Sequence, residues 1–168
     1  MHKNVFVGLI TCIAFIMAIG CGESAEQKIN ALKNSGKLYP VEKLAQVKTL
    51  NFIDTQYVWV NTAYRDYSAK ALFPTLVTLE LDLASPAIIA SIGADSLQLA
   101  KSLTAKFRSK TTAHFMGQSM LGKKLNIYYY TMEESDIFSV IHEFKFPYRA
   151  TFTTDAGWQR LQQLQNKK

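Results

Sequence analysis

The segment from Val77 to Leu83 alternates apolar and polar side chains without a break. In an extended chain, side chains two residues apart point to the same side, so this segment has one apolar side and one polar side. The apolar side carries Val77, Leu79, Leu81 and Leu83, and the polar side carries Thr78, Glu80 and Asp82. The pattern predicts a strand with one face buried in a sheet and one face in water.

Further segments with helical or strand periodicity follow this strand. First come a short helical turn over 85–89 and a helix capped by Asp95, whose buried stripe carries Leu97, Ala100, Leu103 and Phe107. Strands over 112–120 and 125–131 follow. The remaining elements are a helix that opens with Glu133, Glu134 and Asp136 and ends at Pro147, a strand over 148–154 and a terminal helix over 157–166. In the strand over 112–120, strict alternation puts Ala113, Phe115 and Gly117 on one face and His114, Met116 and Gln118 on the other.

The order strand, helix, strand, strand, helix, strand is typical of a split βαβ arrangement. It predicts an α+β fold, a ferredoxin-like sandwich in which helices cover one face of an antiparallel sheet. Residues 56–63 predict an extra strand before this unit, and residues 157–166 an extra helix after it. Val41, Leu44, Val47 and Leu50 recur in steps of three residues and predict a short helix over 41–50.

The N-terminus carries a targeting signal. Val5 to Ile19 is almost wholly apolar and would span roughly 22 Å as a helix, less than the roughly 30 Å of a hydrocarbon core. Residues 1–20 therefore predict a signal peptide. Ala18-Ile19-Gly20-Cys21 resembles the lipobox of bacterial lipoproteins, which implies lipid attachment at Cys21. The alternatives are an uncleaved anchor, or cleavage that leaves Cys21 free. Sorting rules place an aspartate directly after the lipidated cysteine in proteins kept at the inner membrane. This chain has Gly22 there, which favours a protein anchored in the outer membrane and facing the periplasm.

Cleavage divides the chain into a signal (1–20), a lipidated tether (21–40) with at most one helical turn, and a single α+β domain (41–168). The 168-residue length allows one ordinary domain, and 48% hydrophobic with 19% charged residues excludes a disordered chain and a multispan protein. Only Cys21 remains after cleavage, so no internal disulfide can form. The net charge falls from +6 to +5 because Lys3 is the one charged residue lost.

The second half of the chain resembles a known family. The residues that carry the resemblance are Thr112 to Gln118 (TAHFMGQ), Gly122, Ile127 to Tyr130 (IYYY), and Asp155-Ala156-Gly157-Trp158. They look like an uncharacterised bacterial domain-of-unknown-function family that is similar in layout to the regulator of ribonuclease activity B. The resemblance implies a ferredoxin-like fold that works by protein contact, and it supplies no catalytic residues.

No motif in the sequence assembles a catalytic, cofactor or metal site. The two mature histidines, His114 and His142, lack the spacing of a zinc-binding helix, and there is no phosphate-binding or dinucleotide-binding glycine motif. Asp155 is interpreted as an N-cap for the terminal helix, with Trp158 as its anchor. We therefore predict no cofactor, no metal and no catalytic residue.

The leading hypothesis is a non-catalytic lipoprotein, held at the membrane through its N-terminal lipid, whose domain binds another envelope protein. We expect its binding surface at His114, Tyr128, Tyr130 and Arg149, on a sheet face not covered by helices. The alternative is a periplasmic small-ligand binder or enzyme with a site assembled from His114, Glu143 and Asp155. Nucleic-acid binding is not expected, because an exported protein does not meet cytoplasmic nucleic acids. The run Tyr128-Tyr129-Tyr130 also lacks the RNA-binding strand motif.

Overall fold

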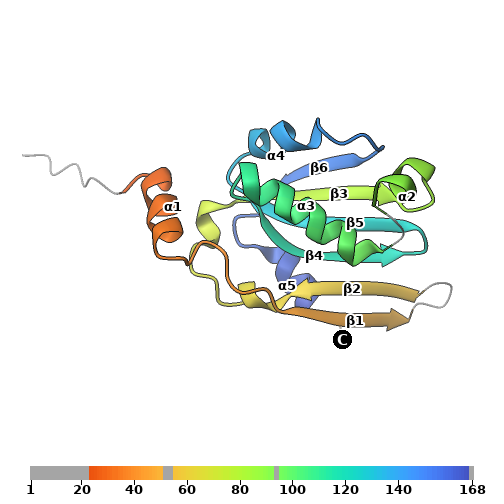
Figure 1. Cartoon of the computed structure of the whole chain (residues 1–168). Coiled ribbons are helices and arrows are strands. Elements are labelled where there is room, and N and C mark those ends of the chain that lie inside the picture. Colours follow the sequence, from red (N-terminus) through yellow and green to blue (C-terminus); the bar gives the residue numbers. More distant parts are fainter. Residues whose placement is uncertain (1–22, 51–54, 93–94, 167–168) are drawn as a thin grey trace, which may run out of the picture.

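The computed structural model describes residues 23–50, 55–92 and 95–166, which form an α+β fold (Figure 1). The predicted signal peptide (1–20) and Cys21 lie outside the described residues. The strands are β1 (Leu44–Leu50), β2 (Thr55–Asn61), β3 (Thr75–Asp82), β4 (His114–Leu121), β5 (Lys124–Thr131) and β6 (Arg149–Thr154). The helices are α1 (Ala25–Asn34), α2 (Pro86–Ile92), α3 (Ser96–Lys110), α4 (Glu134–Ile141) and α5 (Gln159–Gln165), with short 3₁₀ turns η1 (Thr62–Tyr64) and η2 (Lys70–Leu72).

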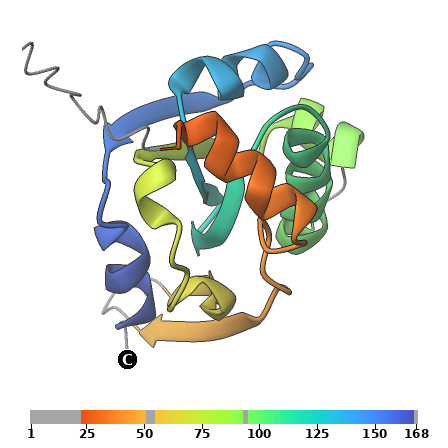
Figure 2. The same ribbon diagram turned by 90° about the vertical axis from the view of Figure 1, so that its left-hand side faces the viewer.

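These strands form one open antiparallel sheet in the order β1-β2-β4-β5-β3-β6. Helices α3 and α4 pack on one face, and α5 lies on the other, together with η1 and η2 (Figures 1 and 2). We call these the α3 face and the α5 face. Since helical elements cover both faces, the expectation of one uncovered sheet face is wrong.

Each face has its own hydrophobic core. Val77, Leu79, Leu81 and Leu83 share the α3 face, as their alternation predicts, and pack against α3 and α4 together with Phe107, Tyr129 and Ile137. The α5-face core contains Val58, Val60, Tyr64, Phe73, Leu76, Tyr130, Trp158, Leu161 and Leu164. Leu76 is buried there, so the polar side of β3 is only partly in water.

A β-bulge in β4 changes the predicted alternation. The register with β5 shifts between Phe115 and Gly117, which adds a residue to β4 and reverses the side-chain pattern beyond it. Gln118 therefore lies on the α3 face, where its Nε2 donates to Ser96 Oγ at 3.0 Å. The expectation that Gln118 shares a face with His114 is wrong.

Residues 44–50 form a strand, so the helix predicted over 41–50 is wrong. β1 pairs with β2 along its whole length, from Leu44 opposite Asn61 to Leu50 opposite Thr55. Steps of three residues over so short a segment do not exclude a strand, and pairing with β2 gives its backbone hydrogen-bonding partners. Val41, at the start of the expected apolar stripe, is 84% exposed.

The described part of the expected tether is folded against the sheet. α1 begins with a capping box, in which the Ser24 side chain accepts from the Gln27 backbone and the Gln27 side chain accepts from the Ser24 backbone. Ile29 and Leu38 are buried in the α5-face core. Residues 23–40 therefore extend the folded unit, and the prediction of at most one helical turn is wrong.

Candidate functional site

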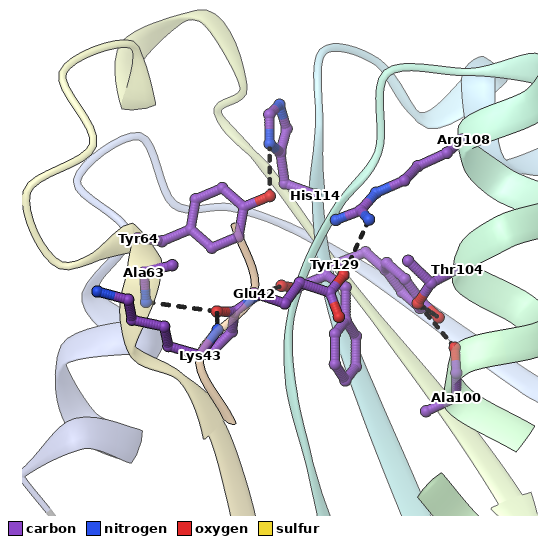
Figure 3. A network of polar contacts seen from close by, with 11 residues as sticks. Glu42, Lys43, Ala63, Tyr64, Ala100, Thr104, Arg108, His114 and Tyr129 are labelled. Atoms are coloured by element: carbon purple, nitrogen blue, oxygen red, sulfur yellow. Dashed lines mark hydrogen bonds and ion pairs between the residues drawn. The ribbon is translucent and has the colours of Figure 1, made fainter. Parts of the chain in front are cut away.

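His114 occupies the centre of a buried aromatic cluster on the α5 face. Its ring lies 4.1 Å from the ring of Phe73 and between 5.2 and 5.9 Å from four others, measured between centroids. The four are Tyr39, Tyr64, Tyr67 and Trp158. His114 Nδ1 is 3.2 Å from the Tyr64 hydroxyl oxygen, and Figure 3 shows the two groups facing each other. Among the described residues, Nε2 has no hydrogen-bonding partner.

The electrostatics of this cluster keep its groups neutral. Burial, together with the smaller effect of the nearby positive charge of Arg108, lowers the pKa of His114 to about 3. Burial also raises the pKa of Tyr64, and it raises the pKa of Tyr67 to about 12. At neutral pH the cluster therefore contains a neutral imidazole and neutral phenols. His114 is fully buried, and it lines neither of the two pockets of about 500 and 550 Å³.

A half-buried ion pair joins α3 to the residues just before β1. Arg108 Nη1 lies 2.8 Å from Glu42 Oε1 (Figure 3). The guanidinium also lies 4.5 Å from the centroid of the Tyr39 ring. Below it, the Tyr129 hydroxyl is fully buried and lies 3.2 Å from Thr104 Oγ1, with a pKa raised by burial. These contacts hold α3 to the sheet and to the start of β1, which is a structural role.

A pocket of about 500 Å³ lies where α1 meets the C-terminal end of α3. Its charged lining residues are Glu26, Lys33, Arg108, Lys110 and Asp136. Three of these already have partners outside the pocket: Arg108 pairs with Glu42, Lys110 with Glu143, and Asp136 accepts a hydrogen bond from Thr131 at 2.9 Å. The pocket is therefore of mixed charge, and most of its charged groups are already occupied.

The structure does not bring together the residues of the alternative site. His114 is buried on the α5 face. Glu143 is exposed beyond α4, where it bridges Lys106 (3.1 Å) and Lys110 of α3, and both lysines lower its pKa. Asp155 accepts hydrogen bonds from the backbones of Gln159 and Arg160 at 2.8 and 2.9 Å. Each of the three candidates has separate structural contacts, so the assembled site is wrong.

Asp155 caps the first turn of α5 through these contacts, but Trp158 and not Asp155 occupies the N-cap position that the sequence predicts for Asp155. Its second carboxylate oxygen also accepts from the Tyr130 hydroxyl, whose pKa is raised by burial and by this carboxylate. Trp158 stacks on Tyr130 with centroids 4.3 Å apart, and its indole nitrogen donates to the Phe73 carbonyl oxygen at 2.9 Å. These contacts anchor α5 on the sheet.

The binding surface expected from the sequence is mostly buried. His114, Tyr128 and Tyr130 have at most 3% of their surface exposed, because α5 and the 3₁₀ turns cover the face on which they lie. The Tyr128 hydroxyl is bonded to Ser119 at 2.8 Å and to Arg160 at 2.9 Å. Arg149 is exposed at the start of the edge strand β6. Of the four residues, only Arg149 is accessible.

Exposed aromatic surface is found instead on the α3 face of β2. Tyr57 and Trp59 are both half-buried, and their rings stack with centroids 5.9 Å apart. They belong to the α3 face because their neighbours Val58 and Val60 pack into the α5-face core. Sequence reasoning identified this strand but missed the pair as a surface. The sequence could have indicated this surface, because β2 has apolar side chains on both sides and only one of the two sets packs into the α5-face core.

The described residues contain neither a candidate metal site nor a candidate membrane span. No group of three or more His, Cys, Asp or Glu side chains converges there to hold a metal ion. Of the helices that the structure describes, none is long and apolar enough to cross a membrane.

Comparison of the chain with protein-family models, with curated proteins and with solved structures finds no match.

Proposed function

We propose that this protein is a lipid-anchored lipoprotein of the bacterial outer membrane whose periplasmic domain binds another envelope protein and has no catalytic activity. The anchor is Cys21, which follows the apolar run Val5–Ile19 in a lipobox-like sequence. The capping box that starts α1 begins at Ser24, so four residue steps separate Cys21 from Ala25. These span at most about 14 Å. The end of the domain that carries α1 therefore stands next to the bilayer.

The polar side chains that could form a catalytic site are engaged in structural contacts, which favours binding over catalysis. His114 and Asp155 make structural contacts on the α5 face, and Glu143 makes its contacts with α3. The observation that carries the proposal is the stacked pair Tyr57 and Trp59, which remains half-exposed on a part of the sheet without a helix. Trp and Tyr are enriched among the residues that dominate protein interfaces.

We assign the fold to the ferredoxin-like sandwiches, with added elements. In the order β6-β3-β5-β4, the chain follows two split βαβ units whose helices α3 and α4 share one face. The hairpin β1–β2 extends the sheet beyond β4, and α5 covers the opposite face. This arrangement also supports the similarity in layout to the regulator of ribonuclease activity B, and with it a function through protein contact.

The anchor is tested by the intact mass of the protein purified from membranes. We expect a mature chain that begins at an acylated Cys21, and a Cys21→Ser variant that keeps its signal sequence and lacks the lipid. Density-gradient separation of the two membranes then tests the outer-membrane location, which Gly22 favours. An unmodified Cys21 in the mature protein would refute the anchor.

A further inference from the structure

The α3 face of β1 and β2 forms a platform without a helix above it. In the sheet register, Leu44 lies opposite Asn61, Gln46 opposite Trp59, and Trp59 also opposite Gln118 on β4. Residues directly opposite each other share a face. We define the platform as Leu44, Gln46, Tyr57 and Trp59, all of which are exposed or half-buried. In Figure 1, α3 and α4 lie over β4, β5, β3 and β6, while β1 and β2 extend past them.

A pocket of about 210 Å³ continues this platform along the flank of α3. It is lined by Glu42, Lys101, Thr104, Ala105, Arg108 and Phe115. Glu42 of this pocket comes two residues before Leu44 of the platform, so the two regions are neighbours. The buried Asn61 ties β2 to β4 between them, since its side-chain nitrogen donates to the Phe115 carbonyl oxygen at 3.2 Å. We call the platform and the adjoining pocket, beside α3, the hairpin groove.

The hairpin groove has one charge that is not neutralised. Glu42 and Arg108 pair with each other at 2.8 Å. Lys101 is exposed on the wall that α3 forms, and no ion pair of the described residues includes it. A partner that fits this groove needs an apolar side for Trp59 and Tyr57, with a carboxylate beside it for Lys101.

We propose that the hairpin groove binds an amphipathic, acidic helix of the partner protein, which lies beside α3. This inference rests on the proposed protein-binding function and names the surface and the chemistry of the partner. A helix fits because the rest of the same face is already covered by the helices α3 and α4. Its apolar stripe covers Trp59 and Tyr57, and its acidic flank meets Lys101. A strand added to the edge of β1 would instead leave the two rings uncovered.

Site-specific photo-crosslinking of the full, acylated protein in intact cells tests this surface. A photo-reactive amino acid is placed at Gln46 or Ala105 in the groove, and at Thr151 on the opposite sheet edge, all three of which are exposed. The proposal expects crosslinks from positions 46 and 105 to residues of one partner that are three or four apart in its sequence and flanked by Asp or Glu. Such spacing is that of one helix face.

Charge variants supply the second readout. Lys101→Glu is expected to reduce the crosslink from position 46 about tenfold, because it places like charges together at a binding site. Lys123→Glu, an equal change in the β4–β5 turn, serves as the matched control and should leave the crosslink unchanged. Trp59→Ala should also abolish it, with circular dichroism to verify folding. Gln46→Glu tests the platform without removing a packed ring, and it should weaken the crosslink from position 105.

The outcomes separate the two proposals. Crosslinks from position 151 alone, or partner residues at alternating positions as in a strand, would overturn the groove and keep a protein-binding function. An equal loss of crosslink in Lys101→Glu and Lys123→Glu would overturn the acidic partner. Absence of any crosslinked protein at all three positions would overturn the binding function itself.

Discussion

The backbone of Gly117 lies so close to that of Trp59 that a β-carbon at position 117 would come within 2.1 Å of the Trp59 carbonyl oxygen. Gly117 is at the β-bulge of β4 and has a φ of 145°, a conformation that side chains with a β-carbon rarely adopt. The close approach of β2 to β4 at this point therefore requires glycine, and so does the bulge that reverses the side-chain direction beyond it.

Gly117→Ala should destabilise the domain strongly. The clash is with backbone atoms, so it is relieved only by moving β2 away from β4, and we expect a loss of about 3 kcal/mol or more in the free energy of unfolding. Gly122→Ala is the matched control: Gly122 also has a positive φ, of 58°, but nothing lies within 4 Å of its added β-carbon. Gly122→Ala should lower the free energy of unfolding by only about 1 kcal/mol. Equal losses in chemical denaturation would refute the close approach.

The two tryptophans should differ both in stability and in access to solvent. Trp158→Phe removes the hydrogen bond to the Phe73 carbonyl oxygen and part of the stack on Tyr130. We expect it to lower the free energy of unfolding by about 2–3 kcal/mol. Trp59→Phe, at a half-exposed ring, should lose less than about 1 kcal/mol.

Acrylamide quenching checks this difference directly. The fluorescence that remains in Trp158→Phe comes from Trp59 and should be quenched readily, whereas the fluorescence that remains in Trp59→Phe comes from the buried Trp158 and should be protected. Similar quenching in the two variants would contradict the burial of Trp158.

The parts of the fold that the sequence predicts are those with a strong local period. The alternation over Val77–Leu83 predicts β3, and similar patterns predict β2, β4, β5 and β6 to within two residues. The sequence predicts a helix in place of β1, because three-residue steps over so short a segment fit both a helix and a strand. Pairing with β2 determines its structure. α1 was overlooked although Ser24 and Gln27 have the spacing of a capping box.

The surroundings of His114 could not be predicted in this way. The rings around it come from residues 39, 64, 67, 73 and 158, in separate segments that meet only when the sheet and α5 are packed. No period or spacing in the sequence connects these segments. The half-exposed pair Tyr57 and Trp59 was predictable, because it follows from the alternation of a single strand.

The buried His114 should make the domain less stable at acid pH. Its pKa is lowered from 6.5 to about 3 by burial, so it stays neutral in the folded state while the unfolded chain takes up a proton below pH 6.5. Because the unfolded state then binds more protons, stability is fully present above pH 6.5 and falls as the pH decreases toward 3, by up to about 1 kcal/mol per pH unit.

His114→Gln should reduce this slope between pH 6 and 4, as measured by urea unfolding at a series of pH values. The variant also loses ring contacts, so the comparison concerns the slope and not the absolute stability. His142→Gln, which removes an exposed ring at the end of α4, is the control and should keep the slope of the native protein. A His114→Gln slope equal to that of the native protein would show that His114 takes up its proton without unfolding.

Ile29→Ala tests whether the residues that follow the proposed anchor, Cys21, belong to the domain. Ile29 is 5% exposed and packs into the α5-face core, so its truncation should cost about 2–3 kcal/mol in the free energy of unfolding of the whole domain. Lys28→Ala, at the exposed neighbouring position of α1, should change it by less than about 0.5 kcal/mol. Amide exchange in residues 25–34 should be slow in the native protein and faster in Ile29→Ala. A free tether would give the opposite result: no effect of either substitution on the unfolding midpoint, and fast exchange throughout α1.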